Sequence, residues 1–132
     1  MKKFLCLAFV CLFLCGCTRP EAPHQIKWVT RITADYQKGV IQLHRDYTND
    51  EKIRTVLDYF RSLSPYGNEA TVPQDGLYAQ VTVYYSDGSQ KVYEQQNDAF
   101  LRQNGGIWQN IDPEKGMELG LLLAMTESDE SF

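Results

Sequence analysis

Beyond residue 17 the sequence contains no cysteine, because all four cysteines fall within the first seventeen residues. This distribution excludes a disulfide framework and a thiolate metal site from the rest of the chain. Histidine is equally scarce: only His24 and His44 occur, so a zinc site would need several carboxylates beside them. We therefore expect a domain that is stabilised by its core alone and that carries no metal or other cofactor.

The common signatures of catalysis and nucleotide binding are also missing. The sequence has no glycine-rich phosphate loop, no nucleophile elbow and no paired-histidine zinc motif. Positive charge is in short supply as well. Without Lys2 and Lys3, the thirteen basic residues fall to eleven against seventeen acidic ones, which is a formal charge of −6. A chain of this charge is not expected to bind nucleic acid.

What the sequence does have is a short apolar run behind a basic start. Lys2 and Lys3 are followed by apolar residues from 4 to 14 and then by Gly16 and Cys17. This order is typical of a cleaved signal peptide. Eleven residues of helix rise only about 16 Å, whereas the hydrocarbon core of a bilayer is about 30 Å thick. The run is therefore too short for a permanent span and predicts export.

The segment Leu14-Cys15-Gly16-Cys17 resembles the bacterial lipobox, in which Leu, a small residue and Gly precede an invariant Cys. The resemblance implies cleavage before Cys17 and lipidation of that residue, although Cys15 replaces the usual Ala, Ser or Thr. Residues 1–16 are then a lipoprotein signal peptide, and residues 17–25 are a lipidated N-terminus and tether held in the bilayer by acyl chains. The implied address is the extracytoplasmic face of the cell membrane. The alternative is an ordinary secretory signal with a coincidental cysteine.

A second resemblance is to small uncharacterised lipoproteins of Clostridia-type Firmicutes. It rests on hairpin and cap elements spread over most of the mature chain, namely Tyr85-Ser86-Asp87-Gly88-Ser89, Lys91-Val92-Tyr93, Trp108, Ile111-Asp112-Pro113, Gly116 and Leu119. The resemblance implies a location and a fold, and it carries no activity.

Residues 26–125 are expected to form one domain, because 116 of the 132 residues remain after residues 1–16, too few for two ordinary domains. Period-two alternation and turn residues predict six strands, and helical spacing behind N-caps at Thr48 and Asp112 predicts two helices. The strands are expected at 26–36, 40–47, 77–85, 90–96, 99–103 and 107–111, and the helices at 48–63 and 112–125. A loop is predicted at 65–76 and an acidic tail at 126–132.

Hairpins without parallel crossovers imply an antiparallel sheet, and two amphipathic helices imply one covered face. The predicted fold class is therefore α+β: an antiparallel β-sheet with two helices packed on one face, a two-layer sandwich in the order ββα-ββββα. At fold level this order resembles β-lactamase-inhibitor-like proteins. Trp28 and Trp108 are expected in the core. Gly116 and Gly120, four residues apart on one helix face, are expected to allow a close approach to the sheet.

Tyrosines on the second predicted hairpin suggest a binding surface. If Asp87-Gly88 is a two-residue turn, Tyr84 and its neighbours face away from the core, and such a surface suits a protein or a glycan. The candidate binding residues are Tyr78, Tyr84, Lys91 and Tyr93. Plain β-propensity on an exposed face explains the same tyrosines. The same register places Glu94 on the core side, which requires a position at the sheet rim or a bulge that turns Tyr93 inward.

His44 and Asp46 form the other candidate, since residues two apart on a strand share one face at about 7 Å. They could share a ligand or a proton, with Asp35 as a further member, or they could simply lie on the solvated face. The sequence thus supports a non-enzymatic binding or inhibitory module that uses the outer sheet face, with an envelope protein or a glycan as partner. The alternative is an envelope hydrolase or metal-dependent enzyme around His44 and Asp46.

Overall fold

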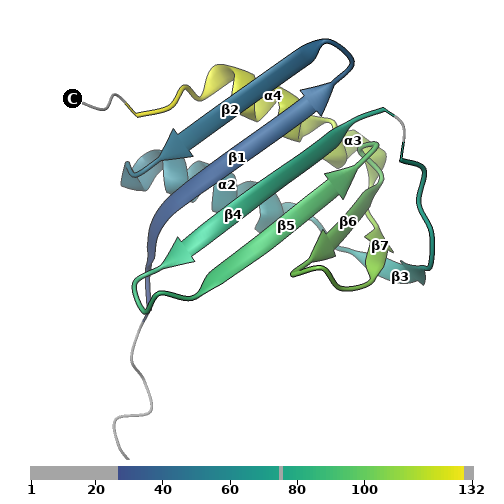
Figure 1. The fold of residues 1–132 in the computed structure, drawn as a ribbon, viewed down its shortest axis with the longest axis horizontal. Helices are drawn as coiled ribbons and strands as arrows, with labels where there is room; N and C mark the ends of the chain where they lie inside the picture. Colours follow the sequence, from purple (N-terminus) through teal and green to yellow (C-terminus); the bar gives the residue numbers. More distant parts are fainter. Residues whose placement is uncertain (1–26, 75, 130–132) are drawn as a thin grey trace, which may run out of the picture.

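The computed structural model describes residues 27–74 and 76–129, and these residues form one antiparallel sheet of seven strands with helices beside it (Figure 1). The strand order is β2-β1-β4-β5-β6-β7-β3. The strands are β1 (Val29–Lys38), β2 (Ile41–Tyr47), β3 (Tyr66–Glu69), β4 (Tyr78–Tyr85), β5 (Gln90–Gln96), β6 (Phe100–Gln103) and β7 (Trp108–Asn110). The helices are α2 (Asp50–Ser62), α3 (Pro113–Gly116) and α4 (Glu118–Met125). The predicted α+β class with an antiparallel sheet is confirmed.

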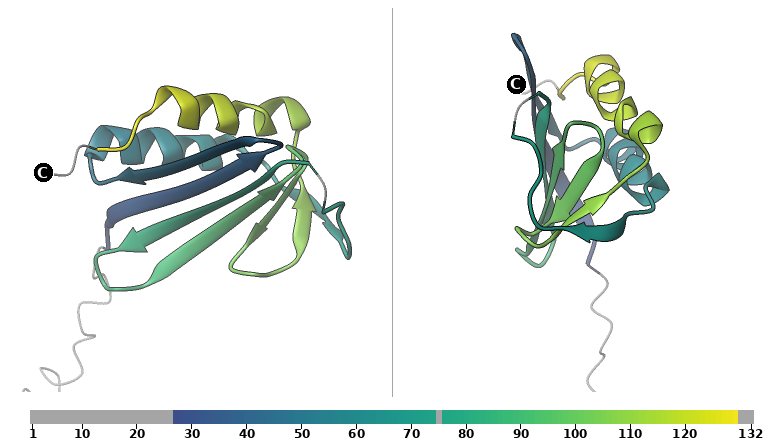
Figure 2. Two further views of the ribbon diagram at one scale, coloured as in Figure 1. Left: turned by 45° about the horizontal axis from the view of Figure 1, so that its top comes forward. Right: turned by 90° about the vertical axis from the view of Figure 1, so that its right-hand side faces the viewer.

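The helices lie together on one side of the sheet (Figure 2), and side chains from both layers meet in a single core. Alternation along each strand sends every second residue to this side. The buried apolar residues of the sheet are Ile32, Ala34, Tyr36, Tyr47, Ala79, Val81, Val83 and Leu101. The helices contribute Ile53, Val56, Tyr59, Phe60, Leu119 and Leu123. The opposite face of the sheet carries mostly polar side chains, and we call it the open face.

Helix starts follow the chemistry of their caps. Asp112 is confirmed as an N-cap, because its Oδ1 accepts the backbone N–H of Glu114 at 3.0 Å. The predicted cap at Thr48 is wrong. The N-cap of α2 is Asn49, whose Oδ1 accepts the backbone N–H groups of Glu51 at 2.9 Å and Lys52 at 3.3 Å. A short side chain one residue further along therefore takes the role that the capping-box spacing had assigned to Thr48.

Three further predictions need correction. The segment 65–76 is not all loop, because it contains β3, which pairs with the distant strand β7. The last helix is two helices, α3 and α4, which meet at Met117. Trp108 is buried as expected, although it packs against Arg102 and not within the core cluster between the layers, whereas Trp28 is 64% exposed and does not belong to the core. The predicted signal peptide, the lipidation site Cys17 and the tether fall outside the described residues.

No helix within residues 27–74 and 76–129 has the length and apolar character needed to cross a membrane.

The start of the acidic tail is built into the domain. Asp129 accepts hydrogen bonds from the backbone N–H groups of Thr48 and Asn49, the latter at 2.7 Å, and it pairs with Lys52 at 3.1 Å. The Asp129 N–H donates to the Asp46 carbonyl at 3.0 Å. The hydrogen bonds from the Thr48 and Asn49 N–H groups, more than the charge of Lys52, hold the pKa of Asp129 well below its ordinary value. Residues 126–129 therefore close the N-terminal end of α2 and lie along β2.

Asp129→Asn is expected to lower the midpoint of thermal unfolding at neutral pH. A carboxyl whose pKa is depressed on folding stabilises the protein above its unfolded pKa of about 3.9 and loses that contribution as the pH falls below it. The wild-type advantage should therefore be present at pH 7 and shrink below about pH 4. Thermal unfolding at pH 7 and pH 3 checks this. Glu127→Gln, a neutralisation two residues earlier at an exposed side chain, is the control; an equal loss in both variants would contradict the role of Asp129.

Candidate functional site

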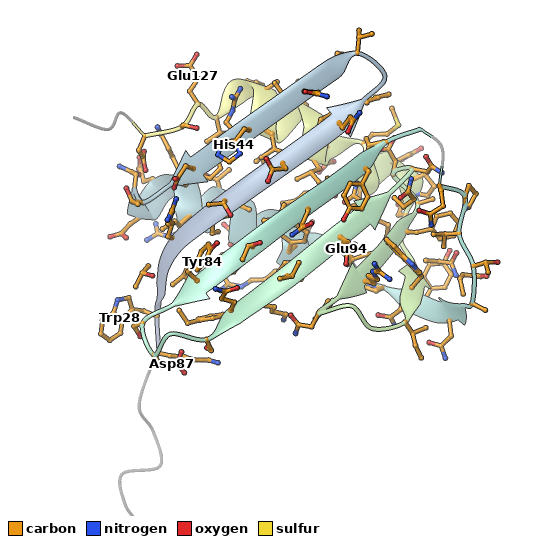
Figure 3. The ribbon with its side chains drawn as sticks, viewed as in Figure 1. Trp28, His44, Tyr84, Asp87, Glu94 and Glu127 are labelled. Atoms are coloured by element: carbon orange, nitrogen blue, oxygen red, sulfur yellow. The ribbon has the colours of Figure 1, made fainter. Side chains whose placement is uncertain are left out.

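A row of polar side chains crosses the open face from one strand to the next. The strand register places His44 on β2 opposite Asp35 on β1, and Asp35 opposite Gln80 on β4. Gln80 is paired with Glu94 on β5, and Glu94 with Arg102 on β6. Neighbouring strands lie about 4.8 Å apart, so these five side chains form a continuous line across the sheet. Figure 3 shows His44, Tyr84 and Glu94 on the same side of the sheet, with the helices behind it.

One end of this row is a closed network around Glu94. The Tyr78 hydroxyl donates to Glu94 Oε2 at 2.8 Å, and Arg102 donates to both Glu94 oxygens at 2.8 and 2.9 Å. The Arg102 guanidinium also lies 4.6 Å from the centroid of the Trp108 ring. Such bidentate pairs are the stronger kind of hydrogen bond and hold both partners in place. The network fixes the Tyr78 ring on the open face.

The network also determines protonation. Burial first, and the hydrogen bond to Glu94 second, raise the pKa of Tyr78 to about 12. The hydrogen bond from Arg102 is the main reason why the pKa of Glu94 lies below its ordinary value. Glu94 is therefore an ionised acceptor and Tyr78 a neutral donor throughout the physiological pH range. Neither group is tuned to exchange a proton near pH 7.

At the other end of the row lies a hollow of about 460 Å³. His44 Nδ1 lies 2.7 Å from Asp35 Oδ1, and both side chains are about two-thirds exposed. The polar groups and the ring around the hollow come from three strands: Asp35, Gln37, Gln42, His44 and Tyr78. Tyr36 and Leu43 complete the lining. The hollow thus combines donors, acceptors and two tyrosines, and Tyr78 belongs both to it and to the Glu94 network.

The four predicted binding residues do not form one surface. Tyr78 and Tyr84 lie on the open face, whereas Lys91 and Tyr93 lie on the helix-covered side, opposite Val83 and Val81. The predicted register was wrong by one residue, because the loop has three residues (Ser86, Asp87 and Gly88) and not two. Tyr85 N–H donates to Ser89 O at 3.0 Å, and Gly88 adopts a φ of +87°. This is a type I turn followed by a left-handed glycine, the usual three-residue hairpin.

Tyr93 consequently belongs to the packing between the two layers. Its ring stacks on Phe60 of α2, with 4.1 Å between centroids and 12° between planes. Lys91 places its ammonium 5.0 Å from the centroid of the Tyr93 ring. With Tyr93 inside, Glu94 falls on the open face, so the conflict over Glu94 is resolved by the shifted register that the sequence had left as one alternative.

The group proposed around His44 is rearranged. Arg31 binds Asp46 through two hydrogen bonds, Nε to Oδ1 at 2.9 Å and Nη2 to Oδ2, so Asp46 is occupied. The partner of His44 is Asp35, directly across the β1–β2 pair. Within residues 27–74 and 76–129 there is no group of three or more His, Cys, Asp or Glu side chains that could hold a metal ion. The arrangement is a two-residue pair on an exposed surface.

Sequence reasoning missed Gln37 and Arg102 as members of the site. Alternation along each strand contains part of the signal, because Asp35, Gln37 and Gln80 all occupy positions opposite in phase to the buried residues. Their alignment across the sheet depends on the register between strands, which alternation does not determine.

No protein-family model matches the chain, and neither a curated protein nor a solved structure matches it. The functional argument therefore rests on the geometry of the described residues and on the N-terminal sequence.

Proposed function

We propose that this chain is a lipid-anchored protein on the extracytoplasmic face of a bacterial membrane, and that it is a non-enzymatic module which binds an envelope protein or a glycan through its open sheet face. The support for the address is the order of basic residues, apolar run and lipobox-like Leu14-Cys15-Gly16-Cys17. Lys27 is ten residue steps along the chain from Cys17, a reach of at most about 35 Å when extended. The domain would therefore work close to the bilayer.

The observation that carries the binding proposal is the hollow on the open face, next to a tyrosine that the Glu94 network holds in place. Tyr78 keeps one fixed orientation, and the polar side chains of Gln37, Gln42 and His44 surround it. A rigid ring that has donors and acceptors around it binds a polar partner with little loss of side-chain freedom. Tyr84 extends this surface along β4, beside Arg31 at 5.6 Å from its ring centroid.

Binding is favoured over catalysis because the acidic groups of this face already have partners. Arginines occupy the carboxylates of Asp46 and Glu94, and Asp35 pairs with His44. A hydrolytic site needs a nucleophile or an activated water held against a base and beside a group that stabilises the developing charge. Around its hollow the His44–Asp35 pair has two amide side chains, Gln37 and Gln42, and the tyrosines Tyr36 and Tyr78, none of which is a nucleophile held against a base. These contacts favour a binding module over the hydrolase alternative.

Site-specific crosslinking tests the proposed surface in the lipidated protein, in the cells that make it. A benzophenone amino acid in place of Gln80 or Tyr84 should give a discrete crosslinked product, because both positions lie on the open face. The same amino acid at Leu121, which is 63% exposed on α4, is the matched control and should give none. His44→Ala should reduce the yield from position 80 several-fold. Equal products from positions 80 and 121 would rule out the open face as the binding surface.

A further inference from the structure

A second concavity lies on the opposite side of the sheet, between α2 and the end of the β4–β5 hairpin. It has a volume of about 550 Å³ and is lined by residues 27–29, by one side of α2 between Asp50 and Arg61, and by Tyr85, Lys91 and Tyr93 of the hairpin. We call it the basic groove. Ile53, Leu57 and Tyr93 give it apolar walls, while cationic side chains come from both of its sides. Nothing in the binding proposal above uses these residues.

The groove concentrates positive charge in an acidic chain. Four of its lining residues are cationic (Lys27, Arg54, Arg61 and Lys91), and one, Asp50, is acidic. Two more carboxylates lie at its margin. Asp58 pairs with Arg61 at 3.4 Å. The pKa of Asp87 lies below its ordinary value, mainly because Ser89 donates hydrogen bonds to it and to a smaller extent because of the charge of Lys27. The ammonium of Lys27 lies 4.5 Å from the centroid of the Tyr85 ring, and that of Lys91 lies over Tyr93. Lys27, Arg54 and Lys91 thus give the groove its attraction for anions.

Trp28 stands beside this groove at the point where the described chain begins. Its indole is 64% exposed, although its backbone is fixed to the hairpin: Ser86 Oγ accepts its N–H at 3.1 Å, and its carbonyl accepts the Ser86 N–H at 2.8 Å. Figure 3 shows Trp28 at the same end of the molecule as Asp87. An exposed indole on a fixed backbone is the side chain that bilayer interfaces favour, since its ring is apolar and its N–H is polar.

We propose that the basic groove and Trp28 dock the domain onto a bilayer surface that carries anionic phospholipid headgroups. This inference rests on the proposed lipid anchor, because acylation of Cys17 would confine Lys27 within about 35 Å of that surface and so raise its effective concentration there. Charge complementarity, the adjacent indole and the position next to the tether all indicate the same occupant. With this end against the headgroups, the hollow at the far end of β1 and β2 stays open toward a partner.

The test uses the chain from residue 17 onward with Cys17→Ser, so that no acyl chain contributes to binding. The core residues lie between Ile32 and Leu123, and this chain keeps all of them. Vesicles of phosphatidylglycerol and phosphatidylcholine in equal parts should co-sediment the protein, and vesicles of phosphatidylcholine alone should not. High salt should release the protein because the attraction is electrostatic. Insertion of Trp28 should shift fluorescence emission to shorter wavelength, a change that Trp28→Phe removes.

Charge removal gives the decisive comparison. Each cationic side chain near an anionic surface contributes about fivefold to partitioning, so Lys27→Gln with Lys91→Gln should weaken vesicle binding about 25-fold. The matched control, Lys38→Gln with Lys115→Gln, removes the same charge; Lys38 lies at the opposite end of β1 from the groove. If both double variants lost vesicle binding equally, the attraction would depend on total charge and not on the groove, and the proposal would be overturned. Binding of soluble polyphosphate without binding of the anionic vesicles would also overturn the proposal.

Acyl labelling distinguishes a failure of the docking proposal from a failure of the proposed lipid anchor. Cells grown with a labelled fatty acid report whether Cys17 is lipidated, independently of vesicle binding. Acylated protein together with a soluble form that does not bind anionic vesicles would remove the docking proposal and leave the anchor. Groove-dependent vesicle binding without acylation would uphold the docking surface and remove the anchor.

Discussion

Gly116→Ala is expected to lower the free energy of unfolding by about 3 kcal/mol or more. A Cβ at this position would lie 2.6 Å from the carbonyl carbon of Asp98 and 3.0 Å from its Cα, which is backbone and not a movable side chain. That backbone cannot retreat freely, because Ala99 on its far side bonds to Gln96 at 3.3 Å and to Ile111 at 2.9 Å. Urea unfolding followed by tryptophan fluorescence measures the loss.

Gly120→Ala is the control for this prediction. Its Cβ would lie 2.5 Å from the hydroxyl oxygen of Tyr36 and 2.9 Å from the ring carbon that bears it, and a tyrosine ring end can turn aside. The loss should therefore be smaller, and adding Tyr36→Phe should recover part of it. A Gly116→Ala protein within about 1 kcal/mol of the wild type would show that α3 does not sit this close to the β5–β6 turn. Both glycines do permit close contacts, but not on one helix face as expected: Gly116 ends α3 against the β5–β6 turn, and Gly120 lies in α4 against Tyr36 of β1.

Gln95→Leu is expected to cost about 2–4 kcal/mol, although leucine matches glutamine roughly in size. Gln95 is 1% exposed, its Oε1 accepts the Tyr59 hydroxyl at 2.5 Å, and its Nε2 donates to the Gly116 carbonyl at 2.8 Å. Leucine would leave a buried hydroxyl and a buried carbonyl without their main partner, at about 1–3 kcal/mol each. The Gln95 side-chain amide therefore binds Tyr59 of α2 and Gly116 of α3 at one position of β5.

A double-mutant cycle with Tyr59→Phe separates this network from simple packing. In the wild-type background Tyr59→Phe leaves Gln95 Oε1 without its hydrogen-bond donor and should lower the free energy of unfolding. In the Gln95→Leu background it removes a hydroxyl that already lacks its main acceptor, so it should cost less or recover stability. Purely additive losses in urea unfolding would mean that the two side chains act independently. Burial raises the pKa of Tyr59 far above its ordinary value, so this donor stays protonated over the whole range of the experiment.

Patterns within short segments predicted much of the fold. The alternation of β4 and the Asp87-Gly88 turn predicted the bounds of β5 at 90–96 correctly, and the Asp112-Pro113 pair predicted the start of α3. Both signals are local, since side-chain direction in a strand and the orphan N–H groups of a helix start depend on neighbouring residues alone. β3 has no comparable signal. It is four residues long, contains Gly67 at a φ of +70°, and pairs with a strand about forty residues away.

Whether the predicted binding residues share one face of the sheet depended on the length of the β4–β5 loop, to within one residue. Asp87-Gly88 is compatible with a two-residue turn or with the last two residues of a three-residue loop, and a slip of one exchanges the faces of β5. The signal that could have decided the register was Glu94, since burying its carboxylate against Val81 without a partner is costly. Its partners Arg102 and Tyr78 lie on β6 and β4, so the polar network becomes visible only when the sheet is assembled.

The position of the C-terminal tail also affects how molecules of this protein meet one another. β2 is an edge strand, and an exposed edge offers unpaired backbone groups to any other extended chain. Ser128 Oγ accepts the Asp46 N–H at 3.0 Å, and the Asp46 carbonyl accepts the Asp129 N–H. The tail thus occupies the part of this edge nearest α2 and prevents strand addition there. Residues 126–129 look dispensable in the sequence, yet they cover backbone groups through which two copies of the sheet could otherwise pair.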